Sequence, residues 1–111
     1  MLNQIQIAGL PKPMDSWPFD QSPDCAVITL RQILDGTAAI LEVSHDSDDH
    51  GWQFMTPGDP KEEDLVLICF SHLIELDSSL LELAQLEPGW IATRVSPGKP
   101  WRCEPNPDEA R

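Results

Sequence analysis

Prolines and glycines divide this chain into short apolar segments, and this limits the folds open to it. The 111 residues include 11 prolines and 6 glycines. Proline fixes φ and removes a backbone donor, so it rarely lies inside a regular element. Pro57-Gly58, Pro88-Gly89 and Pro97-Gly98 each interrupt the apolar pattern. Segments of this length predict strands and short helices rather than one long helix.

The first half of the body is expected to contain three strands. Residues 25–33 and 38–44 are predicted to pair through Leu34-Asp35-Gly36-Thr37, because Asp-Gly favours a tight hairpin. Residues 51–56 are predicted to be a third strand. Its alternation places Trp52 and Phe54 on one face, as a core strand requires.

Helix signals follow a fourth predicted strand. Residues 65–70 are a continuous apolar run, which predicts a buried strand. One helical turn is expected over residues 72–76. A second short helix is then expected, with Asp77 or Ser79 as its N-cap.

The fold class follows from this order of elements. Residues 90–95 are the last predicted strand, and residues 101–103 could pair back on it. We predict an α+β fold, with a mainly antiparallel sheet of about five strands and one or two short helices packed on one face.

The chain is expected to contain a single domain, since its length allows one core without disulfide or metal support. Residues 1–24 are predicted to be a proline-rich arm that Trp17 and Phe19 pin to the body. Residues 25–104 are predicted to be the α+β domain and residues 105–111 a tail. No apolar run is long enough to cross a membrane and no basic, apolar leader is present, so we expect a cytoplasmic protein.

Charge is distributed unevenly along the chain. The net charge is −12, and residues 42–87 contain twelve acids against one base, Lys61. Residues 88–103 contain three bases and no acid. Such a field repels nucleic acid and anionic membranes and attracts basic proteins. A basic protein is therefore the expected partner, although solubility alone could also explain the acidity. The pattern defines no oligomeric state.

The cysteines give no sign of a disulfide framework or a zinc ribbon. Cys25, Cys69 and Cys103 are widely spaced and form no Cys-x-x-Cys pair. They are expected to be reduced cysteines that lie in the core or in strands.

The segment from His45 to His50 contains residue types that ligate metals. Asp46, Asp48 and Gly51 match the first, third and sixth positions of a calcium loop, but the twelfth position is Pro57, where a glutamate is needed. We therefore expect a solvated loop, with no metal and no cofactor. The alternative function is a small metal-dependent enzyme or metal-binding domain that uses this loop.

No catalytic residue is predicted. Cys69, Ser71 and His72 are neighbours in sequence, but a strand would place Cys69 and His72 on opposite faces. The chain also lacks a nucleophile elbow and a glycine-rich phosphate loop.

Tryptophan and arginine are the expected anchors of a binding surface. Trp90 and Trp101 follow turn signals and could be either core residues or surface anchors. Arg94 and Arg102 could pair with acids of the same chain or face a partner. The candidate partner-binding residues are Asp46, Asp48, Asp49, Trp90, Trp101, Arg94 and Arg102.

Several of these motifs resemble those of a family of small bacterial proteins. The matching features are Leu34-Asp35-Gly36, Asp49-His50-Gly51-Trp52-Gln53-Phe54, the Asp77 helix start, and the two motifs Pro88-Gly89-Trp90 and Pro100-Trp101-Arg102. The family was long catalogued as a domain of unknown function and was later grouped with immunity proteins of polymorphic toxin systems. The resemblance implies a non-catalytic module that binds another protein and neutralises it. Together with the acidic charge, it leads us to expect that the bound protein is a basic toxin. A soluble housekeeping role remains a further alternative.

Overall fold

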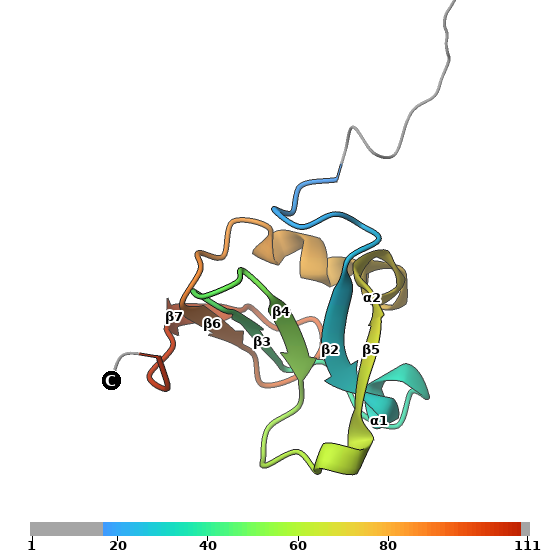
Figure 1. Cartoon of the computed structure of the whole chain (residues 1–111). Helices are drawn as coiled ribbons and strands as arrows, with labels where there is room; N and C mark the ends of the chain where they lie inside the picture. Colours follow the sequence, from blue (N-terminus) through green and yellow to red (C-terminus); the bar gives the residue numbers. More distant parts are fainter. Residues whose placement is uncertain (1–16, 110–111) are drawn as a thin grey trace, which may run out of the picture.

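The computed structural model describes residues 17–109, in which six strands form one mixed sheet with the order β5-β2-β4-β3-β6-β7 (Figure 1). The strands are β2 (Ala26–Leu30), β3 (Glu42–His45), β4 (Trp52–Met55), β5 (Leu65–Cys69), β6 (Trp90–Thr93) and β7 (Arg102–Pro105). β2 and β4 run parallel, and the other neighbouring pairs are antiparallel. The predicted α+β class with a mainly antiparallel sheet is confirmed.

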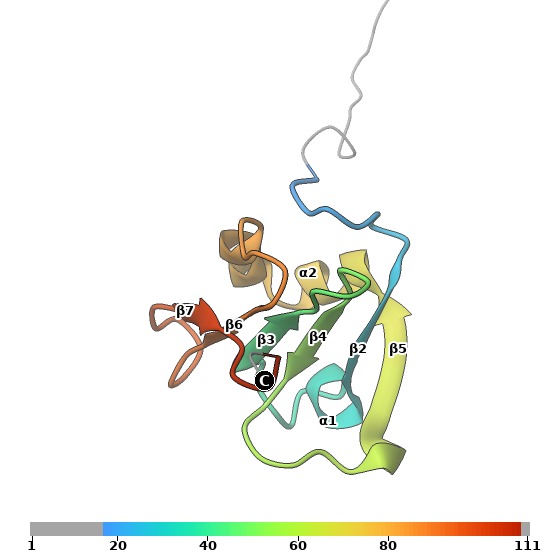
Figure 2. The same ribbon diagram turned by 60° about the vertical axis from the view of Figure 1, so that its left-hand side comes forward.

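The helices are short, as the spacing of the turn signals predicts. They are α1 (Arg31–Leu34), η2 (Glu62–Asp64), α2 (Phe70–Leu76) and η3 (Ser78–Leu83), and η2 and η3 are 3-10 helices. Figures 1 and 2 show α2 and η3 along the same side of the sheet. Asp77 is the N-cap of η3, and its side chain accepts a hydrogen bond from Ser79 N at 3.1 Å. No helix within residues 17–109 is long and apolar enough to span a membrane.

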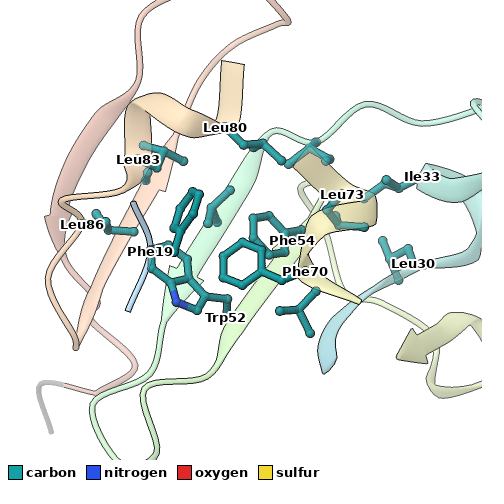
Figure 3. Packing of buried hydrophobic residues seen from close by; sticks show 14 residues of the cluster. Phe19, Leu30, Ile33, Trp52, Phe54, Phe70, Leu73, Leu80, Leu83 and Leu86 are labelled. Carbon is teal, nitrogen blue, oxygen red and sulfur yellow. The ribbon is translucent and has the colours of Figure 1, made fainter. Parts of the chain in front are cut away.

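The core lies between this face of the sheet and the two helices (Figure 3). Trp52 and Phe54 alternate with half-buried neighbours on β4, so both rings point into the core, as predicted. The helices contribute Phe70, Leu73 and Leu80, which are fully buried. Burying a side chain of this size contributes about 1.5–3 kcal/mol, which explains why such short elements hold together.

The core extends to residues that precede Cys25. The Phe19 ring lies 4.5 Å from the Phe70 ring and 5.2 Å from the Trp52 ring. The Trp17 ring also contacts Phe70, at 5.2 Å. The prediction that Trp17 and Phe19 pin the arm is confirmed. Residues 1–16 of the predicted arm lie outside the described residues.

The predicted hairpin at Asp35-Gly36 is wrong. β2 ends at Leu30, and residues 31–34 form α1 instead of continuing the strand. Gly36, with φ of 86°, ends this helical turn in the left-handed conformation that glycine tolerates. β2 pairs with β4 and β5 rather than with β3, so the chain crosses over where the sequence suggested a tight turn.

The prediction that residues 65–70 form a buried strand is also wrong. β5 is an edge strand whose side chains alternate between exposed and half-buried, and Leu67 is 71% exposed. The three cysteines are free, and Cys69 and Cys103 lie in β5 and β7, as one of the two expectations for them states, although both are exposed. A continuous apolar run does not by itself distinguish a buried central strand from an edge strand.

Candidate functional site

An open acidic hollow lies at one end of the sheet, where the loop after β3 meets the segment after β7. Its lining residues are Asp46, Ser47, Asp48, Asp49, Asp108 and Glu109. Five of these six residues are acids, and none is a base. The hollow therefore combines three predicted site residues with two acids from the predicted tail.

The loop between β3 and β4 is held by its own polar groups. Asp46 N donates to Gly51 O at 2.8 Å, and Gly51 N donates to Asp49 Oδ1 at 2.8 Å. A Cβ at position 51 would lie 2.9 Å from Asp49 Oδ1, so glycine lets the carboxylate fold back onto the backbone. His50 adopts φ of 60°, which is unusual for a residue other than glycine. This geometry explains why glycine follows two positions after the aspartate in the Asp49-His50-Gly51 motif.

The C-terminal segment docks beside this loop. Asn106 is buried, and its N–H donates to Gly89 O at 2.8 Å. Ser47 N donates to Glu109 Oε1 at 3.3 Å, and the Ser47 hydroxyl donates to the same oxygen. Residues 106–109 of the predicted tail thus complete the hollow.

The carboxylates of the hollow repel one another. Partial burial raises the pKa of Asp46, and the neighbouring carboxylates Glu109, Asp49 and Asp48 raise it further against a hydrogen bond from Gln53. Within residues 17–109, no ion pair involves Asp46, Asp48 or Asp49. A cation placed beside Asp46, Asp48 and Asp49 would therefore be stabilised by a local field that no ion pair within residues 17–109 neutralises there.

A second cluster lies beside the same loop and consists of Asp20, His45 and His50. Asp20 Oδ2 lies 2.9 Å from His45 Nε2 and 3.3 Å from His50 Nδ1. One ligand atom from each residue lies within 4.8 Å of the other two. His45 is buried in β3, whereas Asp20 and His50 are partly open to solvent.

Neighbouring groups orient this cluster. His45 Nδ1 contacts Leu86 O at 2.7 Å, and the His45 ring stacks on Trp52, its cross-strand neighbour, at 4.0 Å. Trp52 Nε1 donates to Asp20 Oδ1 at 3.0 Å. Burial acts to raise the pKa of Asp20, but the Trp52 hydrogen bond and the two histidines outweigh burial and lower the pKa.

The remaining predicted site residues do not join the hollow as one patch. Trp90 pairs with His45 and so lies at the same end of the sheet as the hollow. Arg94 and Arg102 lie at the other end of β6, where Thr93 pairs with Arg102. The Arg102 side chain is 80% exposed, with Glu104 at 3.8 Å.

Arg94 is wrongly predicted as a partner-binding residue, because only 6% of it is exposed. Its Nη2 donates to Asp77 Oδ2 at 2.7 Å, which confirms the prediction that Arg94 pairs with an acid of the same chain. Half-buried Trp101 covers the guanidinium, with its ring centroid 4.2 Å from Arg94 Cζ. Both residues thus stabilise the fold at the end of the sheet far from the hollow.

Sequence reasoning missed Asp20, Asp108 and Glu109. Asp20 lies 25 residues before His45, so no local spacing links the two. The useful signal was Phe19, because a residue that pins the arm to the core necessarily brings Asp20 to the body. The two C-terminal acids carried no such signal.

Comparisons with known proteins returned no match for this chain among protein-family models, curated proteins or solved structures.

Proposed function

We propose that this protein is a non-catalytic binding module for a basic protein and that the acidic hollow is its binding surface. The resemblance described above gives the more specific proposal, in which the partner is a basic toxin that the protein neutralises in the cytoplasm. No nucleic acid, membrane or cofactor is part of this function.

The observation that carries the proposal is the charge at Asp46, Asp48 and Asp49, which no ion pair among the described residues neutralises. Folding brings these carboxylates together with Glu109, although partial burial and then repulsion from Glu109, Asp49 and Asp48 raise the pKa of Asp46 and disfavour its charged form. Solubility alone would be served equally well by acids spread over the surface. A lysine or arginine side chain of a partner would relieve the repulsion, and the field would accelerate its approach.

Trp90 is the proposed apolar neighbour of this surface. It is half-buried at the end of β6 that lies at the same end of the sheet as the hollow, and with Leu86 and Cys103 it lines a second shallow depression. Interfaces commonly combine such an aromatic anchor with a polar rim. The charged hollow would then set the association rate, while Trp90 would slow dissociation.

Affinity capture from the source organism tests the proposal with three forms of the full chain. These are the wild type, the hollow variant Asp46→Asn/Asp48→Asn/Asp49→Asn, and a matched control, Asp59→Asn/Glu62→Gln/Glu63→Gln. Both variants remove three negative charges, and the control residues are all exposed and lie outside the hollow. Asparagine keeps an oxygen that accepts a hydrogen bond, so the loop should retain its shape.

The wild type and the control should retain the same basic protein, and the hollow variant should lose it. Raising the salt concentration should release this protein, because screening weakens interactions between exposed charges. Equal retention by all three forms, or retention that salt does not change, would contradict the proposal. A captured nuclease or other toxin whose activity the wild type inhibits would support the immunity role.

A further inference from the structure

We propose that Asp20, His45 and His50 form a binding site for a divalent transition-metal ion, with zinc as the best-fitting ion. This site goes beyond the protein-binding function, since the hollow and the cluster involve different side chains.

The spacing of the three ligand atoms suits such an ion. Tetrahedral zinc with bonds of about 2.0–2.1 Å places its ligand atoms about 3.3 Å apart. Asp20 Oδ2 lies 3.3 Å from His50 Nδ1 and 2.9 Å from His45 Nε2. All three ligand atoms lie within 4.8 Å of one another, so shifts of about 1 Å or less would complete the geometry.

The hydrogen bonding of His45 points to a cation at this position. A backbone carbonyl can only accept, so the contact with Leu86 O at 2.7 Å requires a proton on His45 Nδ1. In the neutral ring, Nε2 then presents a lone pair to the Asp20 carboxylate at 2.9 Å. Two acceptors this close repel each other unless a positive charge lies between them. A metal ion would supply that charge and would also bind His50. A simple imidazolium–carboxylate pair involves only two of the three side chains.

The surroundings are those of a metal site in which the ligands are held by neighbouring groups. Histidine ligands commonly donate their second N–H to a carbonyl, as His45 does to Leu86 O. Asp20 is fixed by Trp52, and Gln21 Nε2 donates to His50 O at 3.1 Å, which ties the His50 loop to the Asp20 segment. Both partly exposed partners of the buried histidine are thus restrained by the fold.

The chemistry of the ligands selects the class of ion. Two imidazole nitrogens and one carboxylate oxygen suit zinc and related transition metals, whereas calcium and magnesium require oxygen ligands. Exposed fractions of 37% for the Asp20 side chain and 52% for that of His50 leave the cluster open on one side. Water or a side chain of a partner could occupy the fourth position there.

Calorimetric titration with zinc tests the site on the full chain after treatment with a chelator. The wild type should bind one equivalent, and His50→Gln should raise Kd at least tenfold, because even loss of an outer partner of a ligand costs about 10–100-fold. His72→Gln is the matched control, since His72 is exposed on α2 and outside the cluster. His50 is half-exposed, so its variant should fold, which circular dichroism checks. Equal Kd values for the two variants would overturn the proposal.

Two further measurements identify the atoms involved. Nitrogen-15 NMR of the imidazole rings should show zinc-dependent shifts at His45 Nε2 and His50 Nδ1, and none at His72. The absorption spectrum of the cobalt form should lack a thiolate charge-transfer band, because none of the free cysteines Cys25, Cys69 and Cys103 belongs to the cluster. Unshifted His45 and His50 rings, or a thiolate band, would overturn the proposal. Unshifted rings would mean that His45 and Asp20 form an ion pair without a metal.

Discussion

Replacing Arg94 with methionine should destabilise the fold strongly, because the buried guanidinium joins the end of β6 to two other segments, the chain at Ile40 and the start of η3. Its Nε donates to Ile40 O at 3.0 Å, its Nη1 to Ser79 Oγ at 2.9 Å and its Nη2 to Asp77 Oδ2 at 2.7 Å. Only 1% of the Arg94 side chain is exposed. Methionine fills much of the same space but donates no hydrogen bond, so Asp77 keeps its charge and loses its partner.

The size of this destabilisation follows from the burial of the Arg94–Asp77 ion pair. Removing one partner of a buried ion pair costs about 3–5 kcal/mol. The Asp77 side chain is 27% exposed and keeps its hydrogen bonds from Ser79, so water and Ser79 compensate part of this loss. We expect a loss of about 2–4 kcal/mol in the free energy of unfolding. With a urea m value of about 1.5 kcal/mol/M, the unfolding midpoint should fall by about 1–3 M.

Urea unfolding followed by circular dichroism measures this loss. Arg102→Met is the control, because its side chain is 80% exposed and its loss should change stability by at most about 0.5 kcal/mol. A double-mutant cycle with Asp77→Asn should give a coupling energy of about 1–3 kcal/mol. If Arg94→Met is no more destabilising than Arg102→Met, the structural role of Arg94 is refuted and a role in binding a partner returns.

Three further predictions concern the arm, the hollow and the response to acid. Phe19→Ala should lower the free energy of unfolding by about 3–5 kcal/mol in urea, and a loss typical of a surface residue would place the arm outside the core. Partial burial and then repulsion from Glu109, Asp49 and Asp48 raise the pKa of Asp46. Asp46→Asn removes this disfavoured charge and should raise the urea midpoint at neutral pH; a lower midpoint would contradict this prediction. Burial acts to raise the pKa of Asp77, but hydrogen bonds from Ser79 and Arg94 lower it overall. The unfolded chain therefore takes up the proton first as pH falls, and the stability that Asp77 contributes at neutral pH should be lost between about pH 5 and pH 2. Unfolding curves across this range should show a smaller loss for Asp77→Asn, and an equal loss would contradict the assignment.

The parts of the fold that the sequence predicts well are those set by local periodicity. Trp52 and Phe54 alternate with polar or flexible neighbours, so their shared face could be predicted without knowing what covers it. The N-cap at Asp77 is equally local, because its carboxylate binds a backbone N–H only two residues away.

The predictions are wrong where contacts between distant segments determine the local structure. Asp35-Gly36 suits a hairpin and a helix end equally well, and pairing of β2 with β4 and β5 selects the helix end. Leu67 is exposed because β5 lies at the edge of the sheet, a position that its apolar neighbours do not encode. Asp20 reaches His45 only through the packing of Phe19, so the histidine–aspartate cluster follows from tertiary structure alone.

Binding of a defined cationic peptide to the hollow tests the proposed binding surface most directly. Proton–nitrogen correlation spectra of the full chain would be recorded during titration with hexa-arginine at low salt. The largest shifts should fall on residues 46–49 and 108–109. The hollow variant should weaken binding more than the matched control at Asp59, Glu62 and Glu63, although both lose the same charge. Equal weakening in the two variants, or the largest shifts on residues 57–64, would contradict the claim that the hollow is the binding surface.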